Sequence, residues 1–141
     1  MSIEDNKRVV RTFFEEVWNR NDVSKLDEIM SSENKYYFGL NMDRAGPNEA
    51  RAIIEHWRRG FADFQHHVED MIAEGDRVVS RVRFTGTHTG NFEIEGRNLS
   101  ATNAKIEGPE IFIMRVAAGK IVELWTAWDR LGVLRQLGAA V

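Results

Sequence analysis

Hydrophobic residues near the start of the chain recur at the three- and four-residue spacing that places them on one face of a helix. The stripe consists of Val10, Phe13, Phe14, Val17 and Trp18. Ser2 and Asp5 stand three residues apart, as in a capping box, and mark the start of this helix. We therefore expect a helix over residues 3–19.

Similar stripes predict three further helices. Asp22 can cap a short second helix, and Asn48 can cap a third helix that ends near Gly60. Asp129 precedes a short closing helix that ends near Gly138. Between the third helix and the closing helix the pattern changes.

This middle part is rich in β-branched and aromatic residues and alternates with the two-residue period of strands. The predicted strands, with one earlier strand, cover residues 36–38, 68–72, 77–85, 110–116 and 121–128. Turn sequences at residues 74–76 and 117–120 connect antiparallel hairpins, and residues 87–108 are predicted to be a long mobile insert. Helices followed by antiparallel strands predict one α+β domain over residues 1–141.

Composition narrows the chemistry available to this domain. The chain has 141 residues, 43% of them hydrophobic, which is enough for a core without disulfides, and its formal net charge is -3. A mildly acidic chain without a basic cluster argues against nucleic acid as a partner. No apolar run is long enough for a membrane span, so we expect a cytoplasmic protein. Cysteine is absent and no metal-ligand spacing is present, so we expect no metal and no cofactor.

Three segments carry a resemblance to a known family. They read FFEEVWNRND from residue 13, AEGDRVVSRVRFTGTHTG from residue 73 and IFIMRVAAGKIVELWTAWDRLGVLRQLG from residue 111. Together they resemble the SnoaL-like polyketide cyclases, a branch of the nuclear transport factor 2-like superfamily, over nearly the whole chain. The resemblance implies a cystatin-like α+β roll, in which a curved antiparallel sheet forms a cone-shaped barrel around N-terminal helices and leaves a deep apolar pocket. It also implies a homodimer formed through the outer face of the sheet.

Strand alternation and the helix stripes predict which side chains face this pocket. The expected ligand-binding residues are Phe14, Trp18, Tyr36, Phe38, Trp57, Phe61, Phe112, Met114, Leu124, Thr126 and Trp128. A lining so rich in aromatic rings fits a flat hydrophobic small molecule.

The positions at which relatives carry their chemistry hold other residues here. By resemblance, Phe112 stands where aldol-type cyclases have a catalytic His and ketosteroid isomerases an Asp, and Thr126 stands where the cyclases have an acid–base Asp. Phe14 stands where the isomerases have a Tyr. A threonine hydroxyl cannot move a proton at neutral pH as a carboxylate can. The acid–base chemistry has therefore moved to other residues, or the protein has none.

Three residues are candidates for the missing acid or base. Glu110 faces the predicted pocket, although a Glu at the barrel mouth can also be merely solvated. His88 lies between glycines, where a lone His is more often a surface hydrogen-bonding residue. Asp129 begins the closing helix, where an Asp commonly caps backbone amides. His66 and His67 alternate to opposite faces of a strand, so they cannot share a metal, but one of them can point inward.

Two functions fit these features. The first is a polyketide-cyclase-related protein that binds an aromatic or polycyclic molecule and catalyses cyclisation, isomerisation or dehydration next to a carbonyl. Tyr36 or Tyr37 would donate a hydrogen bond to the substrate oxygen, and Glu110, His88 or Asp129 would be the base. The alternative is a non-catalytic binding or dimeric assembly module that has lost the acid–base residues of the family.

Overall fold

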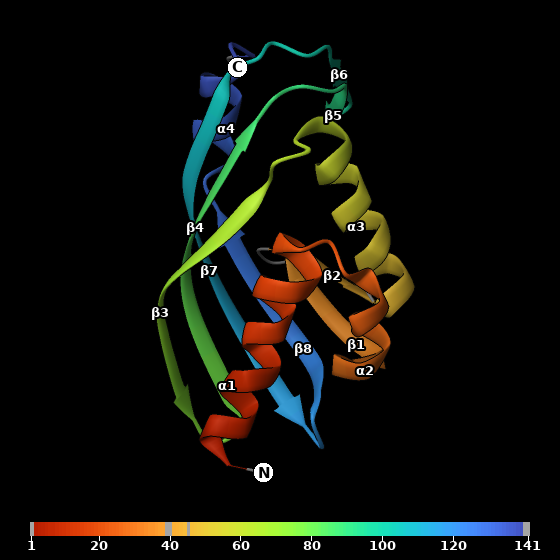
Figure 1. The fold of residues 1–141 in the computed structure, drawn as a ribbon, viewed down its shortest axis with the longest axis vertical. Helices are drawn as coiled ribbons and strands as arrows, with labels where there is room; N and C mark the ends of the chain where they lie inside the picture. Colours follow the sequence, from red (N-terminus) through yellow and green to blue (C-terminus); the bar gives the residue numbers. More distant parts are fainter. Residues whose placement is uncertain (1, 39–40, 45, 140–141) are drawn as a thin grey trace.

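The computed structural model describes residues 2–38, 41–44 and 46–139. Its helical elements are α1 (Ile3–Thr12), η1 (Phe13–Asn19), η2 (Val23–Lys25), α2 (Leu26–Ile29), α3 (Pro47–Gly60) and α4 (Arg130–Gln136). Its strands are β1 (Met30–Phe38), β2 (Asn41–Arg44), β3 (Gln65–Glu74), β4 (Arg77–Thr87), β5 (Phe92–Ile94), β6 (Arg97–Leu99), β7 (Lys105–Ala117) and β8 (Lys120–Trp128). Figure 1 shows α1 across the front of the long strands, α3 beside it, and the β5–β6 hairpin at the upper end of α3.

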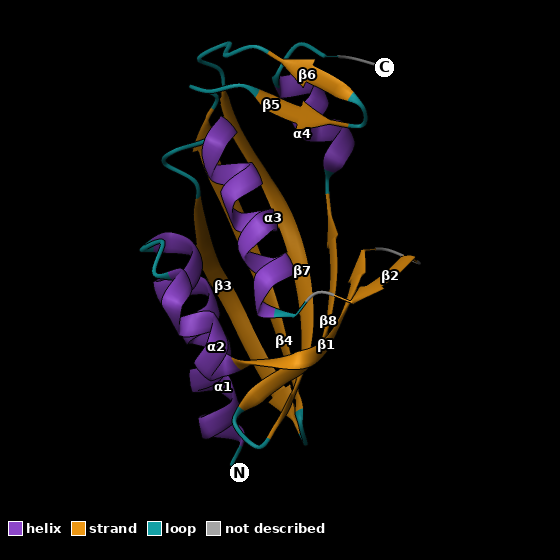
Figure 2. Ribbon diagram, turned by 90° about the vertical axis from the view of Figure 1, so that its right-hand side faces the viewer, coloured by secondary structure: helices purple, strands orange, loops and turns teal. Residues whose placement is uncertain are grey.

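Six strands form one curved sheet in the order β2-β1-β8-β7-β4-β3, and β5 pairs with β6 in a separate hairpin. The predicted α+β fold, with N-terminal helices against one face of the sheet, is confirmed (Figure 2). The sheet is mixed rather than wholly antiparallel, because β1 runs parallel to β8. A hairpin turn enforces antiparallel pairing only between consecutive strands, and β1 and β8 lie far apart in the sequence.

The hydrophobic core lies between the first helical elements and the inner face of the sheet. Phe13 and Phe14 in η1 point toward Phe112 on β7, with ring centroids 6.4 Å and 5.0 Å away. All three rings are almost completely buried. Edge-to-face contacts of this kind stabilise aromatic clusters beyond simple burial, and they fix η1 against the centre of the sheet.

The first predicted helix begins as expected but changes its geometry halfway. The side chains of Ser2 and Asp5 form the capping box at its start. Its second half, η1, is a π-helix, a rare geometry that occurs frequently at functional sites. The guanidinium of Arg58 on α3 donates to the carbonyls of Trp18 and Asn19 at the end of η1. The π-helical segment is therefore tied to α3.

The other helix starts agree with prediction only in part. Asp129 caps α4 as expected, because its carboxylate accepts a backbone N–H of the first turn at 2.9 Å. Asp22 precedes η2 but forms no cap bond with its side chain. The cap of α3 is Gly46 rather than Asn48, since Pro47 occupies the first helical position, where a missing N–H is tolerated. None of the described helices has the length and apolar character of a membrane span.

Most strands extend further than predicted. β1 begins at Met30, where a strand from Tyr36 was expected, and β3 begins at Gln65 rather than Val68. Most of the added positions, residues 31–35 and 65–67, carry polar side chains, which hide the hydrophobic signal of a strand. The β5–β6 hairpin and the first part of β7 occupy much of the stretch that was predicted to be a mobile insert.

Gly90 packs against the last turn of α3 and gives a test of this arrangement. Its N–H donates to the carbonyl of Gly60 at 3.1 Å, and a Cβ added at position 90 would lie 2.0 Å from the carbonyl oxygen of Arg59. Because backbone would have to shift, we expect Gly90→Ala to lower the free energy of unfolding by about 1–3 kcal/mol in urea denaturation. Ser100→Ala, an exposed change in a nearby loop, is the control. Equal stability of Gly90→Ala and the unaltered protein would contradict the close packing.

Candidate functional site

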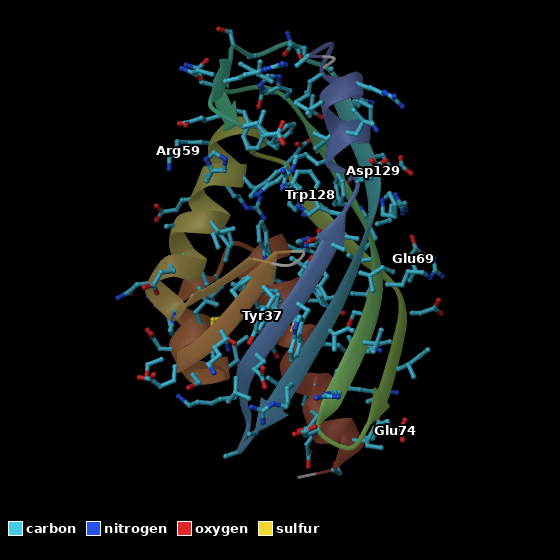
Figure 3. The ribbon with its side chains drawn as sticks, turned by 180° about the vertical axis from the view of Figure 1, so that it is seen from behind. Tyr37, Arg59, Glu69, Glu74, Trp128 and Asp129 are labelled. Carbon is cyan, nitrogen blue, oxygen red and sulfur yellow. The ribbon has the colours of Figure 1, made fainter. Side chains whose placement is uncertain are left out.

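A cavity of about 360 Å³ lies between α3, the β5–β6 hairpin and the inner face of the sheet. Half of the residues that line it are Phe, Trp or Tyr, and they include Trp18, Trp57, Phe64, Phe84, Phe92 and Trp128. The Trp57 ring lies 5.2 Å from that of Trp128 and 4.8 Å from that of Phe92. In Figure 3, Trp128 lies between the end of β8 and α3. The volume is near the lower end of the range of about 300–1,000 Å³ that is typical of small-molecule sites.

Six of the residues proposed from the sequence line this cavity: Trp18, Tyr36, Trp57, Glu110, Phe112 and Trp128. Thr126 lies behind the wall and contacts Glu110. Four others are buried in the hydrophobic core, where helical elements pack directly on the sheet: Phe14, Phe61, Met114 and Leu124. The side chain of Phe38 lies outside the described residues.

Two of the candidate catalytic residues lie away from the cavity. Asp129 caps α4 and is not part of the wall. His88 is completely buried rather than at the surface, and its ring stacks on Phe61 with centroids 5.3 Å apart. Its Nδ1 accepts the backbone N–H of Thr102 at 3.2 Å and lies 2.9 Å from the hydroxyl of the same residue. Neither residue belongs to the cavity wall, and the contacts that each of them makes are structural.

Glu110, the third candidate, presents its carboxylate to the cavity from β7. Its side chain is 12% exposed, so it is not simply solvated. One oxygen, Oε2, accepts the hydroxyl of Thr126 at 2.5 Å, and the other, Oε1, lies 3.4 Å from Nε2 of His66. A carboxylate surrounded by aromatic rings needs such partners, because burial of an unpaired charge is costly.

His66 is the residue whose role the sequence left open. Alternation required one of His66 and His67 to face inward without showing which. In the sheet His66 pairs with Phe84, which is buried on the inner face, while His67 lies 3.0 Å from the hydroxyl of Thr85. The sequence did contain a signal: Phe64 is aromatic, stands two positions before His66 and contacts it at a centroid distance of 5.0 Å.

Two polar atoms in the same wall have no hydrogen-bond partner among the described residues. They are Nε1 of Trp18 and Nδ1 of His66. A buried polar group left unpaired costs about 1–3 kcal/mol. Such groups are uncommon in folded proteins, and they need a specific explanation where they occur. The two rings lie side by side with centroids 4.8 Å apart, and the other ring nitrogen of His66 faces Glu110, so this end of the cavity is the candidate site.

Tyr36 adds a phenol to the same end of the cavity. Its side chain is almost completely buried. Burial, together with the negative charge of Glu110, raises the pKa of the phenol above its ordinary value. Tyr36 therefore keeps its proton at physiological pH and can act as a hydrogen-bond donor.

Among the described residues, no group of three His, Asp or Glu side chains is arranged to hold a metal ion.

Comparison with known families identifies the family of the chain. The sequence model of the SnoaL-like polyketide cyclases matches residues 8–137. The chain therefore belongs to the SnoaL-like polyketide cyclase family. A comparison with curated protein sequences gave no match.

Solved structures with the same fold agree with this assignment. AclR from Streptomyces galilaeus, which has been proposed to be a hydroxylase, is 26% identical, with a TM-score of 0.85 over 99% of this chain and 89% of its own. TsrD from Streptomyces laurentii is 27% identical, with a TM-score of 0.83 over 99% and 98% of the two chains. A proposed SnoaL-like polyketide cyclase from Jannaschia sp. CCS1 is 26% identical, with a TM-score of 0.86 over 100% and 97%. The predicted nuclear transport factor 2-like fold is thus confirmed.

The raised pKa of Tyr36 predicts how stability responds to alkaline pH. Below about pH 10 the phenol is neutral in both states; above it the unfolded chain loses the proton while the folded chain retains it. The free energy of unfolding should therefore fall as pH rises, with a contribution from this residue of up to about 1.4 kcal/mol per pH unit. Urea denaturation between about pH 8 and 11 measures this slope.

Tyr36→Phe should remove that part of the decline. Tyr37→Phe is the matched control, because Tyr37 stacks on Trp125 with ring centroids 5.1 Å apart and does not line the cavity. If the slope were the same in Tyr36→Phe and in the unaltered protein, the buried phenol would not be its source.

Proposed function

We propose that the protein is an acid–base enzyme that acts on a flat, largely apolar carbonyl compound and catalyses cyclisation, isomerisation or dehydration next to the carbonyl. The observation on which this rests is the Glu110 carboxylate, held by Thr126 and His66 at one end of an aromatic cavity, with the Tyr36 phenol nearby. Membership of the polyketide cyclase family supports the reaction class. Proton transfer next to a carbonyl requires one base and one donor to the oxygen.

Glu110 is the base in this proposal. Its carboxylate accepts a proton from the carbon next to the carbonyl, and the electron pair of the broken C–H bond moves toward the carbonyl oxygen. In an isomerisation, the same carboxyl group returns the proton to another carbon. In a cyclisation, the carbanion carbon bonds to a second carbonyl carbon of the same substrate. The C=O π bond of that carbonyl opens, and the carboxyl group of Glu110 gives its proton to the oxygen that gains the charge. The contact with Thr126 holds one carboxylate oxygen in place during this exchange.

Tyr36 supplies the hydrogen bond to the oxygen that gains charge. Its phenol is protonated because burial and Glu110 hold its pKa above the ordinary value. A neutral donor fixed in a site of low polarity stabilises a developing enolate more strongly than water does, since it needs no reorganisation. Tyr37, the other tyrosine considered from the sequence, stacks on Trp125 and is not part of the cavity wall.

The aromatic wall determines the shape of molecule that fits. Trp57, Phe92 and Trp128 form a continuous group of rings along the cavity, with centroid separations of 4.8–5.2 Å. Rings of this kind stack with flat aromatic or conjugated compounds and exclude water from the base. The volume of about 360 Å³ suits a small ligand of a few rings rather than a long chain.

Glu110→Gln tests the base. The amide keeps the size of the side chain but cannot accept the proton, so we expect the rate constant kcat to fall at least about 100-fold with a panel of polyketide-like ketones. The matched control is Glu107→Gln, an identical change on the same strand, whose side chain is 64% exposed and lies outside the cavity. Its rate should stay unchanged.

A different outcome favours the alternative, a binding module without catalysis. The feature that supports it is the replacement of the expected catalytic residues by Phe112, Phe14 and Thr126. Stoichiometric binding of the ketones, without turnover by the unaltered protein, would reject the enzymatic proposal and leave a small-molecule-binding protein. Equal loss of rate in Glu110→Gln and Glu107→Gln would reject Glu110 as the base.

We also infer that the chain forms a homodimer through the outer face of its sheet. The strand register aligns Ile72 with Val79, Val79 with Ile113, and Ile113 with Trp125, and Tyr37 stacks beside Trp125. Ile72 and Val79 are 66% and 36% exposed. A row of apolar side chains across a sheet surface is typical of a surface that another subunit covers, and Trp and Tyr are enriched at such contacts.

Val79→Glu places a charge in the middle of this row. We expect the unaltered protein to sediment as a dimer at micromolar concentration and Val79→Glu to sediment as a monomer, because the interface would bury an unpaired carboxylate from each subunit. Ile3→Glu is the control, since Ile3 is exposed at 41% but lies on α1 rather than on the sheet. A monomeric unaltered protein would contradict the dimer.

A further inference from the structure

His66 is fixed through both its backbone and its ring. Its backbone N–H donates to Oδ1 of Asn19 at 2.7 Å, and its carbonyl accepts from Nδ2 of Asn19 at 2.8 Å. Four aromatic rings meet the imidazole edge to face at centroid distances of 4.8–5.6 Å, those of Phe14, Trp18, Phe64 and Phe112. The side chain is only 2% exposed. The imidazole therefore cannot turn without disturbing the aromatic core.

The surroundings of the two ring nitrogens determine where the proton of the neutral imidazole resides. Nε2 lies 3.4 Å from Oε1 of Glu110, whereas Nδ1 is buried without a partner among the described residues. A proton on Nδ1 would leave a buried N–H unpaired and would direct the lone pair of Nε2 at a carboxylate. A proton on Nε2 avoids both costs, because the N–H then faces the negative oxygen.

We propose that His66 is a positioning residue that acts through Glu110. Its neutral tautomer, protonated at Nε2, directs this N–H at Oε1, while Thr126 donates to Oε2. With a donor on each oxygen, the carboxylate has a single orientation, and its remaining lone pairs are directed at the substrate. The role rests on the proposed function, since Glu110 is the group that takes the proton. The distance of 3.4 Å is long for a hydrogen bond, and such contacts in free enzymes shorten when the substrate binds.

Asn19 explains why His66 can serve in this way. β3 is an edge strand, so backbone groups on its free side have no neighbouring strand to bond. The carboxamide of Asn19 takes the place of that strand at His66 and contacts both backbone groups. Asn19 stands at the end of η1, whose π-helical geometry and contact with Arg58 set its position. Asn19 thus orients His66, and His66 orients Glu110.

The first test is the tautomer itself, measured by nitrogen NMR of the imidazole in the full-length protein without substrate. The His66 signals are identified by their loss in His66→Gln. We expect a pyrrole-like signal from Nε2 and a pyridine-like signal from Nδ1 at neutral pH. Glu110→Gln should let the other tautomer appear, because the Gln amide can accept from a protonated Nε2 or donate to an unprotonated one. His56 at the cavity wall should keep its signals. A proton on Nδ1 in the unaltered protein would overturn the proposal.

The second test separates positioning from a purely structural role. His66→Gln keeps an N–H near the place of Nε2, and His66→Leu removes it. We expect His66→Leu to lower kcat about tenfold or more while KM changes little, and His66→Gln to recover most of the loss. Circular dichroism and thermal unfolding show whether each variant is folded. Equal rates in His66→Leu and the unaltered protein, or no difference between the two His66 variants, would overturn the proposal.

Combining the substitutions completes the test. In the Glu110→Gln background, His66→Leu should cost no further activity, because the group through which His66 acts is gone. The same cost in both backgrounds would contradict action through Glu110. The NMR result does not require turnover, so a protein without ketone activity could still show the Nε2 tautomer. In that case the proposed function would fail while the contact between His66 and Glu110 would stand.

Discussion

A carboxylate can persist among aromatic rings only where neighbouring groups donate to it, because moving an unpaired charge out of water costs several kcal/mol. Glu110 meets this condition through Thr126 and His66, which come from different strands. In the sheet, β3 and β7 are separated by β4, a distance of about 10 Å between backbones. His66 and Glu110 nevertheless meet, because both lie on the concave face of a curved sheet. The curvature of the sheet is therefore a condition for the site.

The helices maintain this geometry from the other side. η1 places Phe13 and Phe14 against the sheet and ends in Asn19, which holds the backbone of His66. Arg58 on α3 binds the last carbonyls of η1, and its neighbour Trp57 belongs to the cavity wall. One end of the cavity and its wall are thus linked by a short series of polar contacts.

Much of the fold could be predicted from the sequence, because hydrophobic spacing reflects burial directly. The period of Val10, Phe13 and Val17 located the first helix, yet it could not distinguish a π-helix, since both geometries bury nearly the same residues. Alternation along β7 predicted that Glu110 faces inward with Phe112. Alternation could not show whether His66 or His67 faces inward, because that choice depends on how β3 pairs with β4.

His88 and Asp129 were candidates because the sequence does not show which side chains line the cavity. Both are titratable, and both lie in segments that resemble the family. The capping of α4 by Asp129 was expected from the sequence, whereas Thr102, the partner of His88, becomes visible only in three dimensions. The sequence identifies which side chains are capable of proton transfer, whereas the structure shows which of them line the cavity.

Glu110 places a carboxylate beside the position at which the resemblance implied an acid–base Asp. The resemblance implied an acid–base Asp at the position of Thr126, and the Glu110 carboxylate lies 2.5 Å from the hydroxyl found there. Thr126 pairs directly with Phe112, so Glu110, two residues before Phe112, is its diagonal neighbour on the inner face. A glutamate has one methylene more than an aspartate, which gives it the reach to cross from one strand to the next. A carboxylate in this region of the cavity can therefore be carried by either of two neighbouring strands, β7 or β8.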